Sequence, residues 1–245
     1  MSSRLKRLPV KAINSFLSVL DLQLVRRGRT FQDYIPFQET LSAARAAGLS
    51  VGDYIDAKHN VPGATQETID RMKDLGVFDR KIEHVCEIGP GSGRYLERTI
   101  RLCHPATYEI YETAADWRQW LVREYKVTAH PADGRSLSQT PSHSRDLVHA
   151  HKVLNGLPIL TACRYLAEMV RVVRDGGVIV FDLLTEECMD EITLDRWVAS
   201  GADYVCSMMP RQYAIDYFHR RGFRFVGSFF ITSVPGMTQY FVFDK

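Results

Sequence analysis

The sequence predicts an α/β fold: a mostly parallel sheet of seven strands with helices on both faces, an antiparallel C-terminal hairpin and an N-terminal helical extension. From residue 82 onward, short β-type runs alternate with longer helical patterns, which is typical of a parallel sheet with crossover helices. A glycine-rich turn at residues 89–93 joins the first of these runs to a helical pattern. The last two runs are joined by the short segment 233–237, which favours a hairpin because parallel strands need a longer crossover.

The N-terminal region, residues 1–80, is predicted to be a helical extension that acts as a lid on a core domain of residues 81–245. Its first apolar helix is expected at residues 13–24, with basic residues on both sides. Two interpretations remain open for this helix. It packs on its own domain or on a second subunit, or it contacts a membrane surface or a polyanion peripherally. Further helices are expected at residues 37–47 and 65–75, and each is followed by a glycine.

The core domain is predicted from its apolar periodicity. Strands are expected at residues 84–88, 107–111, 127–130, 146–150, 178–181, 223–231 and 239–243. Helices are expected at residues 94–102, 114–125, 158–173 and 211–221. The glycine pair 176–177 is expected to stop the third of these helices before the fifth strand begins.

Composition excludes several classes of protein. A chain of 245 residues that is 45% hydrophobic can bury a large core, and its formal net charge of +2 does not suggest a nucleic-acid binder. The 5 cysteines contain no C-x-x-C pair, which argues against a disulfide framework or a zinc site and favours a reducing compartment. No run approaches the roughly 18 apolar residues of a membrane span. The expected location is therefore the cytoplasm.

The glycine-rich turn carries the first functional signal. It follows Glu87, the carboxylate near the end of the first strand, and opens a helix, where glycines let backbone N–H groups approach a ligand closely. A dinucleotide-binding fingerprint would need its third glycine at Arg94. The spacing therefore disfavours a nicotinamide oxidoreductase.

The segment Glu87–Gly93 resembles the first motif of the class I, Rossmann-like, S-adenosylmethionine-dependent methyltransferases, and the resemblance extends over residues 82–245. It implies that S-adenosyl-L-methionine is the cofactor and S-adenosyl-L-homocysteine the product. It also implies that the turn, with Gly89, Pro90, Gly91 and Gly93, wraps the amino-acid part of the cofactor. In the family the leading carboxylate, here Glu87, helps to hold the ammonium end.

Two later acids match further positions of the family. Glu112 follows the second strand, where a carboxylate accepts hydrogen bonds from both ribose hydroxyls, and Glu109 is the poorer candidate because it lies inside the strand. Asp133 follows the third strand and is similar to the acid that meets the adenine amino group. The pair Asp133-Gly134 is also a common turn signal, so a purely local role remains open.

The fourth strand carries two histidines and a lysine at its end. Alternation places His149 and His151 on one face, and the C-terminal ends of parallel strands are where such sheets bind ligands. We expect His151 to act as the general base, with Lys152 as a second catalytic candidate and His149 among the cofactor-binding residues. The alternative is that His151 only forms hydrogen bonds to the cofactor or the backbone.

Asp182, at the end of the fifth strand, could join His151 in a magnesium site like that of some sugar and catechol methyltransferases. Only one acid is clearly placed there, so no metal ligand is assigned.

The expected reaction is transfer of a methyl group to a hydroxyl of a sugar or glycan. The fourth strand lacks the Asn/Asp-Pro-Pro-Tyr/Phe tetrapeptide of relatives that methylate bases and amides. Polar groups that suit a sugar occur at residues 53–60, in the pre-core segment. Residues 51–56 and 236–243 resemble segments of bacterial methyltransferases of sugars and surface glycans. Two alternatives remain open: a small phenolic or other natural-product acceptor, and a non-catalytic cofactor-binding partner protein. The expected partners are thus a small-molecule or glycan acceptor and not nucleic acid.

Overall fold

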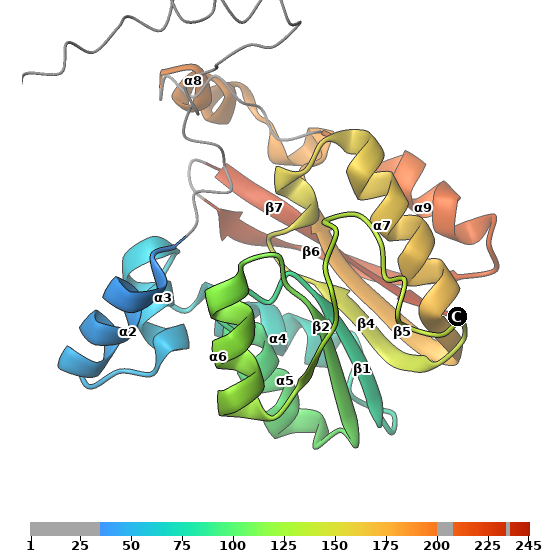
Figure 1. Ribbon diagram of the computed structural model, residues 1–245. Coiled ribbons are helices and arrows are strands. Elements are labelled where there is room, and N and C mark those ends of the chain that lie inside the picture. The colour runs from blue at the N-terminus through green and yellow to red at the C-terminus, as the bar shows by residue number, and fades with distance from the viewer. Residues whose placement is uncertain (1–34, 200–207, 234–235) are drawn as a thin grey trace, which may run out of the picture. The chain divides into compact units, whose positions relative to one another are not determined.

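The computed structural model describes residues 35–199, 208–233 and 236–245. It contains a seven-stranded sheet in the order β3-β2-β1-β4-β5-β7-β6, in which β7 runs opposite to the other strands (Figure 1). The strands are β1 His84–Ile88, β2 Thr107–Tyr111, β3 Thr128–Ala129, β4 Arg145–Ala150, β5 Val173–Leu183, β6 Arg224–Ser233 and β7 Gly236–Asp244. The predicted fold class is confirmed, including the antiparallel hairpin.

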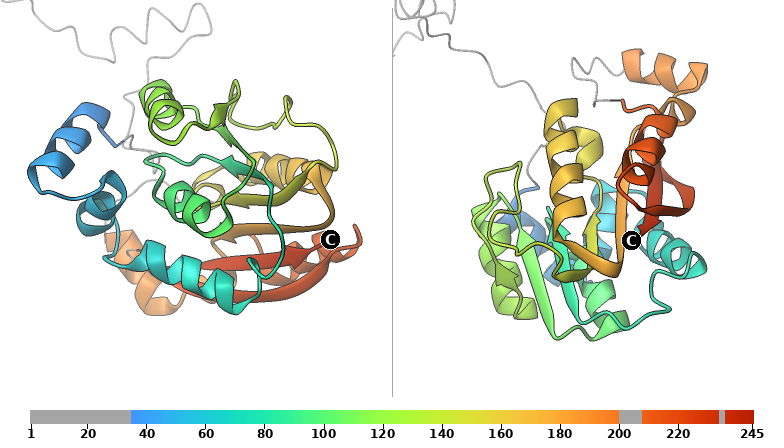
Figure 2. Two further views of the ribbon diagram at one scale, coloured as in Figure 1. Left: turned by 90° about the horizontal axis from the view of Figure 1, so that it is seen from below. Right: turned by 90° about the vertical axis from the view of Figure 1, so that its right-hand side faces the viewer.

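Helices cover both faces of the sheet (Figure 2). Their bounds are α2 Phe37–Ala46, α3 Val51–His59, α4 Ala64–Asp74, α5 Arg94–Cys103, α6 Ala115–Tyr125, α7 Ile159–Val172, α8 Glu191–Ala199 and α9 Arg211–His219, with 3₁₀ turns η2 Leu154–Gly156 and η3 Glu186–Cys188. The helices α4, α5 and α6 pack on one face, and α7 and α9 pack on the other. No helix among these is long and apolar enough to cross a membrane.

Alternation along the strands divides the buried side chains between two cores. Under α7 and α9, Phe218 stacks on Phe243 with ring centroids 4.3 Å apart. On the opposite face, Met72, Leu96 and Leu121 from α4, α5 and α6 are completely buried. Both faces are thus closed, and polar side chains on the central strands are cut off from water.

The predicted boundary between α7 and β5 is wrong. β5 already begins at Val173, and its register against β4 shifts between Arg145 and Leu147, so the glycine pair lies inside a bulged strand. A Cβ at Gly177 would lie 2.9 Å from the carbonyl oxygen of Arg145, which is why only glycine fits there.

Two helices were not predicted. The polar segment before the core forms α3, whose N-cap residue Ser50 accepts a hydrogen bond from the backbone N–H of Asp53 at 3.1 Å. α8 forms in the segment after β5. The helix expected at residues 13–24 lies outside the described residues, whereas α2, α3 and α4 belong to the same compact unit as the sheet.

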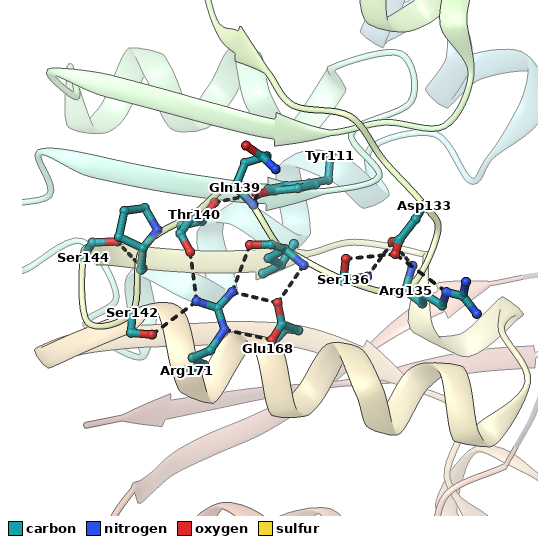
Figure 3. A network of polar contacts seen from close by, with 12 residues as sticks. Tyr111, Asp133, Arg135, Ser136, Gln139, Thr140, Ser142, Ser144, Glu168 and Arg171 are labelled. Atoms are coloured by element: carbon teal, nitrogen blue, oxygen red, sulfur yellow. Dashed lines mark hydrogen bonds and ion pairs between the residues drawn. The ribbon is translucent and has the colours of Figure 1, made fainter.

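The connection from β3 to β4 contains no helix and is held in place by α7 (Figure 3). Arg171 donates hydrogen bonds to the carbonyl oxygens of Leu137 and Thr140, each at 2.9 Å. Glu168 accepts from the N–H of Leu137 at 2.8 Å and pairs with Arg171 at 2.7 Å. This ion pair therefore fixes the loop that carries Asp133.

Candidate functional site

The glycine turn leaves the central strand β1 and opens α5. Gly91 and Gly93 have φ values of 54° and 73°, in the left-handed region that favours glycine. A Cβ at Gly93 would lie 2.5 Å from Leu121, whereas a Cβ at Gly91 would meet nothing within 4 Å. The turn thus closes against α6 at one glycine and stays open at the other, as expected of a backbone cradle for a ligand.

Glu112 lies directly beside this turn. Its Oε2 accepts the N–H of Gly91 at 2.8 Å, and its Oε1 accepts the N–H of Ala114 at 2.8 Å. A carboxylate has about four acceptor sites, so these two bonds leave lone pairs for the hydroxyls of a ribose. The carboxylate is therefore oriented by the glycine turn itself.

Asp133 lies at the edge of the same end of the sheet, with 46% of its side chain exposed. It accepts hydrogen bonds from the backbone N–H groups of Arg135 and Ser136 at 2.9 and 2.8 Å (Figure 3). Its Oδ2 accepts from the hydroxyl of Ser136 at 2.9 Å and lies 3.7 Å from Nε of Arg135, so the carboxylate shapes its own turn.

The two histidines of the fourth strand belong to a chain of buried hydrogen bonds. Nδ1 of His149 lies 2.7 Å from Nε2 of His151, and Nε2 of His149 lies 2.9 Å from the hydroxyl of Tyr108. That hydroxyl donates to Oε2 of Glu87 at 2.6 Å. Ala150 of β4 pairs with Ile88 of β1, so His151 and Gly89 are the next residues of these adjacent parallel strands. The line of hydrogen bonds therefore ends beside the glycine turn.

When Glu87 is a carboxylate, the hydrogen bonds fix the tautomers of both imidazoles. Since the Tyr108 proton points at Glu87, the phenol oxygen accepts from Nε2–H of His149. Nδ1 of His149 is then an acceptor, and it takes the Nε2–H of His151. Nδ1 of His151 is left as a buried lone pair without a hydrogen-bond partner.

Burial is the main cause of the pKa shifts of the residues in this line of hydrogen bonds. Desolvation lowers the pKa of His149 to about 3, and desolvation together with His149, Arg94 and Lys152 holds the pKa of His151 well below 6.5. Desolvation raises the pKa of Glu87 to about 8, although the hydrogen bond from Tyr108 opposes this. Both rings are therefore neutral at physiological pH, while Glu87 titrates close to it.

Lys152 follows His151 in the left-handed region, with φ at 58°. Its N–H donates to Oδ1 of Asp182 at 2.6 Å, and its ammonium lies 3.3 Å from the carbonyl oxygen of Thr232. Burial lowers the pKa of Lys152 to about 8, which Asp182 partly offsets. The lysine thus directs its side chain toward the hairpin.

Asp182, considered together with His151 for a magnesium site, is hydrogen-bonded within the fold. Oδ2 of Asp182 accepts from Asn155 at 2.9 Å and from Thr238 at 2.8 Å, so both of its oxygens are already bonded within the fold. Among the described residues, one group could hold a metal ion by proximity, namely Glu87, His149 and His151. Its two imidazoles face each other at hydrogen-bond distance, and a metal would have to part them. In this structure the group forms a chain of hydrogen bonds.

Several contributors to the site were not identified from the sequence. Tyr95 of α5 stacks on His151 with ring centroids 4.0 Å apart, and Tyr240 of β7 lies 5.7 Å away. Tyr108 bridges His149 and Glu87. Strand alternation gives the two faces of β1 and of β2 separately. Whether Tyr108 shares a face with Glu87 depends on the register between the two strands, which neither strand's sequence reveals.

The polar residues of the segment before the core, now α3, were noted as groups that would suit a sugar. Instead, Asp53 pairs with Arg98 at 3.0 Å, and Asp56 lies 3.4 Å from Arg94. Asp56 also accepts from Thr65 at 2.6 Å. These acids hold α3 on α5 and α4, so they position the segment rather than offering free groups to a ligand.

Comparison with known proteins identifies the type of domain. Residues 86–181 match a family model described as a methyltransferase domain. No curated protein sequence matches the chain.

Solved structures share the fold. An O-methyltransferase family protein from Burkholderia thailandensis is similar, with 16% identity, a TM-score of 0.57, and coverage of 86% of this chain and 64% of that one. The N-methyltransferase NodS from Bradyrhizobium japonicum WM9, in complex with S-adenosyl-L-homocysteine, has 16% identity, a TM-score of 0.56 and coverage of 84% and 96%. An S-adenosylmethionine-dependent methyltransferase from Mesorhizobium loti has 14% identity, a TM-score of 0.51 and coverage of 71% and 96%.

The domain match, the strand order with its antiparallel β7, and the glycine turn after β1 agree with one another. Residues 86–181 therefore form a methyltransferase domain, and the sheet around them has the fold of S-adenosylmethionine-dependent methyltransferases.

Proposed function

We propose that the enzyme transfers a methyl group to a hydroxyl of a sugar or glycan, with His151 as the base that takes the hydroxyl proton. The observation that carries this proposal is the unpartnered Nδ1 of His151, a buried acceptor at the C-terminal end of β4. A hydroxyl must lose its proton as it is methylated, and a neutral imidazole held in place is suited to take it.

The cofactor is proposed to lie along the glycine turn. Gly89, Pro90, Gly91 and Gly93 would surround its amino-acid part, and Glu87 lies at the base of this turn. Glu112 would hold the ribose and Asp133 the adenine amino group. When bound, the cofactor supplies a methyl group that its positive sulfur has already activated.

The protein itself contributes by holding His151 in place and by keeping water away from it. Tyr95 stacks on His151 and restricts the ring to one plane, and the ring of Tyr240 lies tilted beside it, with centroids 5.7 Å apart. A second buried acceptor without a partner, Oδ1 of Asn155, follows the same strand. Two hydrogen-bond acceptors without partners favour a substrate that carries several hydrogen-bond donors, as a polyhydroxylated sugar does.

A phenolic acceptor is the second candidate, because the rings of Tyr95 and Tyr240 around His151 would also suit a planar substrate. The compartment we propose is the cytoplasm, a choice supported by the free thiols of Cys86, Cys103, Cys163 and Cys188.

The proposal is tested by incubating the protein with methyl-labelled S-adenosylmethionine and a matched panel of sugars, glycans, phenols and amines. We expect labelled products among the sugars, with the methyl on oxygen. Label on phenols alone would favour the second candidate, and label on nitrogen would contradict the proposed role of His151. Cofactor binding without transfer to any hydroxyl would favour the non-catalytic alternative.

A further inference from the structure

Four buried side chains on one face of the sheet form an unbroken line of hydrogen bonds from His151 through His149 and Tyr108 to Glu87. The register explains their alignment. Glu87 pairs directly with His149, and Tyr108 pairs with Val85, which shares the face of Glu87. The exposed fraction of each side chain is 5% or less. Such a row of polar groups inside an apolar core is costly unless it is fully bonded, and here the buried Nδ1 of His151 has no hydrogen-bond partner.

We propose that this line is a proton relay that carries the acceptor's proton from Nδ1 of His151 to the carboxylate of Glu87. The proposal rests on the proposed function, since it says where the proton goes after His151 has taken it. His151 is the residue that touches the substrate. Tyr108, His149 and Glu87 act through it, as positioning residues.

The transfer starts from Glu87 as a carboxylate, the form that prevails above about pH 8, and it balances over four hydrogen bonds. Nδ1 of His151 gains the hydroxyl proton, and the Nε2 proton of His151 passes to Nδ1 of His149. The Nε2 proton of His149 passes to the oxygen of Tyr108, whose own proton passes to Oε2 of Glu87. At the end the acceptor oxygen has lost one proton and Glu87 has become a carboxylic acid. Both imidazoles and the phenol are neutral before and after.

The relay solves a difficulty that His151 alone would face. An imidazolium at either buried histidine is strongly disfavoured by desolvation, as the lowered pKa values of both rings show. Glu87 is the opposite case, because burial disfavours its charged form and raises its pKa to about 8. The proton therefore moves to the one member of the line that is stabilised by receiving it.

The charged and titratable groups around the relay come from several elements. Those facing Glu87 are Tyr108, His149 and Glu112, and those facing His151 are His149, Lys152, Arg94, Tyr95 and Tyr240. The cations near His151 oppose a positive ring. The acid near Glu87 opposes a second negative charge. Both effects favour the final state of the relay.

The direct test breaks the relay at Tyr108 and compares it with a matched tyrosine. Tyr108→Phe removes only the bridging hydroxyl, while Tyr111→Phe removes a hydroxyl from the same strand that bonds to Thr140 at 2.9 Å on the other face. We expect Tyr108→Phe to lower kcat about a hundredfold, the usual range for loss of general-base catalysis, with cofactor affinity unchanged. Its pH profile should lose the group near pH 8 that limits the wild type. Tyr111→Phe should keep both.

A second readout needs no turnover and no cofactor. The infrared carbonyl band of a protonated Glu87 should fade as the pH rises through about 8, and it should be missing in Glu87→Gln. In Tyr108→Phe the midpoint should move to higher pH, because the hydrogen bond that favours the carboxylate is gone.

The possible outcomes distinguish failure of the proposed relay from failure of the proposed function. If the wild type transfers methyl groups and Tyr108→Phe keeps its kcat and pH profile, the relay is wrong while the proposed function stands. If the wild type transfers nothing to hydroxyls, the proposed function fails first. A tightly bound metal ligated by His149 and His151 would also overturn the relay. Should Tyr108→Phe fail to fold, the pH profile of Glu87→Gln at saturating cofactor decides instead.

Discussion

Glu87 is an acid with an exposed fraction of 1% and a raised pKa, and this couples its charge to the stability of the fold. Its pKa is about 8 in the folded protein against an ordinary value of 4.5. Between these values the folded state keeps the proton and the unfolded state has released it. The stability that Glu87 contributes is therefore complete below pH 4.5 and is lost as the pH rises toward 8.

Glu87→Gln should remove this dependence, because its amide is neutral at every pH and can still accept from Tyr108. Between pH 5 and pH 7 we expect the free energy of unfolding of the wild type to fall by about 1.4 kcal/mol per pH unit relative to the variant. Urea titrations of the two proteins at a series of pH values measure the difference. Parallel curves would mean that the buried carboxyl does not hold its proton.

The glycine turn acts at the scale of an element, since it joins β1 to α5. Gly93→Ala adds a methyl group 2.5 Å from the buried Leu121, in a left-handed conformation. We expect it to lower the stability by about 1–3 kcal/mol through strain and crowding. Gly91→Ala meets open space, so it should cost only about 1 kcal/mol of backbone strain.

Gly91→Ala, which should be the more stable of the two variants, should lose more affinity for the cofactor than Gly93→Ala. Gly91→Ala places its methyl group in the proposed cradle, and we expect its affinity for S-adenosylhomocysteine to fall more than about tenfold, or about 1.4 kcal/mol. Calorimetric titration of both folded variants checks this. Equal affinity of Gly91→Ala and the wild type would place the cofactor elsewhere.

Arg171 links α7 to the loop that carries Asp133. Arg171→Met keeps much of the side-chain length but removes the bonds to Leu137, Thr140 and Glu168, and we expect a loss of about 1–3 kcal/mol. Hydrogen exchange should speed up across residues 131–144. Arg164→Met, an exposed arginine on the same helix, serves as the control and should leave exchange unchanged. Equal exchange in both variants would show that the ion pair does not hold this loop.

At the scale of the whole molecule, the features that could be predicted from the sequence are those that depend on local patterns of residues. The strands β1 and β2 were placed to the residue, and the glycine turn indicated the cofactor, because each of these signals is contiguous. The bulged start of β5 was missed, since Gly176 and Gly177 are stop signals for a helix as well as features of a distorted strand. The hydrogen bond between Tyr108 and Glu87 was missed for a different reason: it depends on register across β1 and β2, which only the packed sheet fixes.

The most direct test of the proposed function is methyl transfer by His151→Ala, measured beside cofactor affinity. The proposal predicts that the wild type methylates a hydroxyl acceptor and that the variant binds S-adenosylhomocysteine as tightly. The variant should transfer the methyl group at least about a hundredfold more slowly, because it lacks the group that takes the proton. Unimpaired transfer by the variant would contradict the role of His151 and, with it, the relay that begins there.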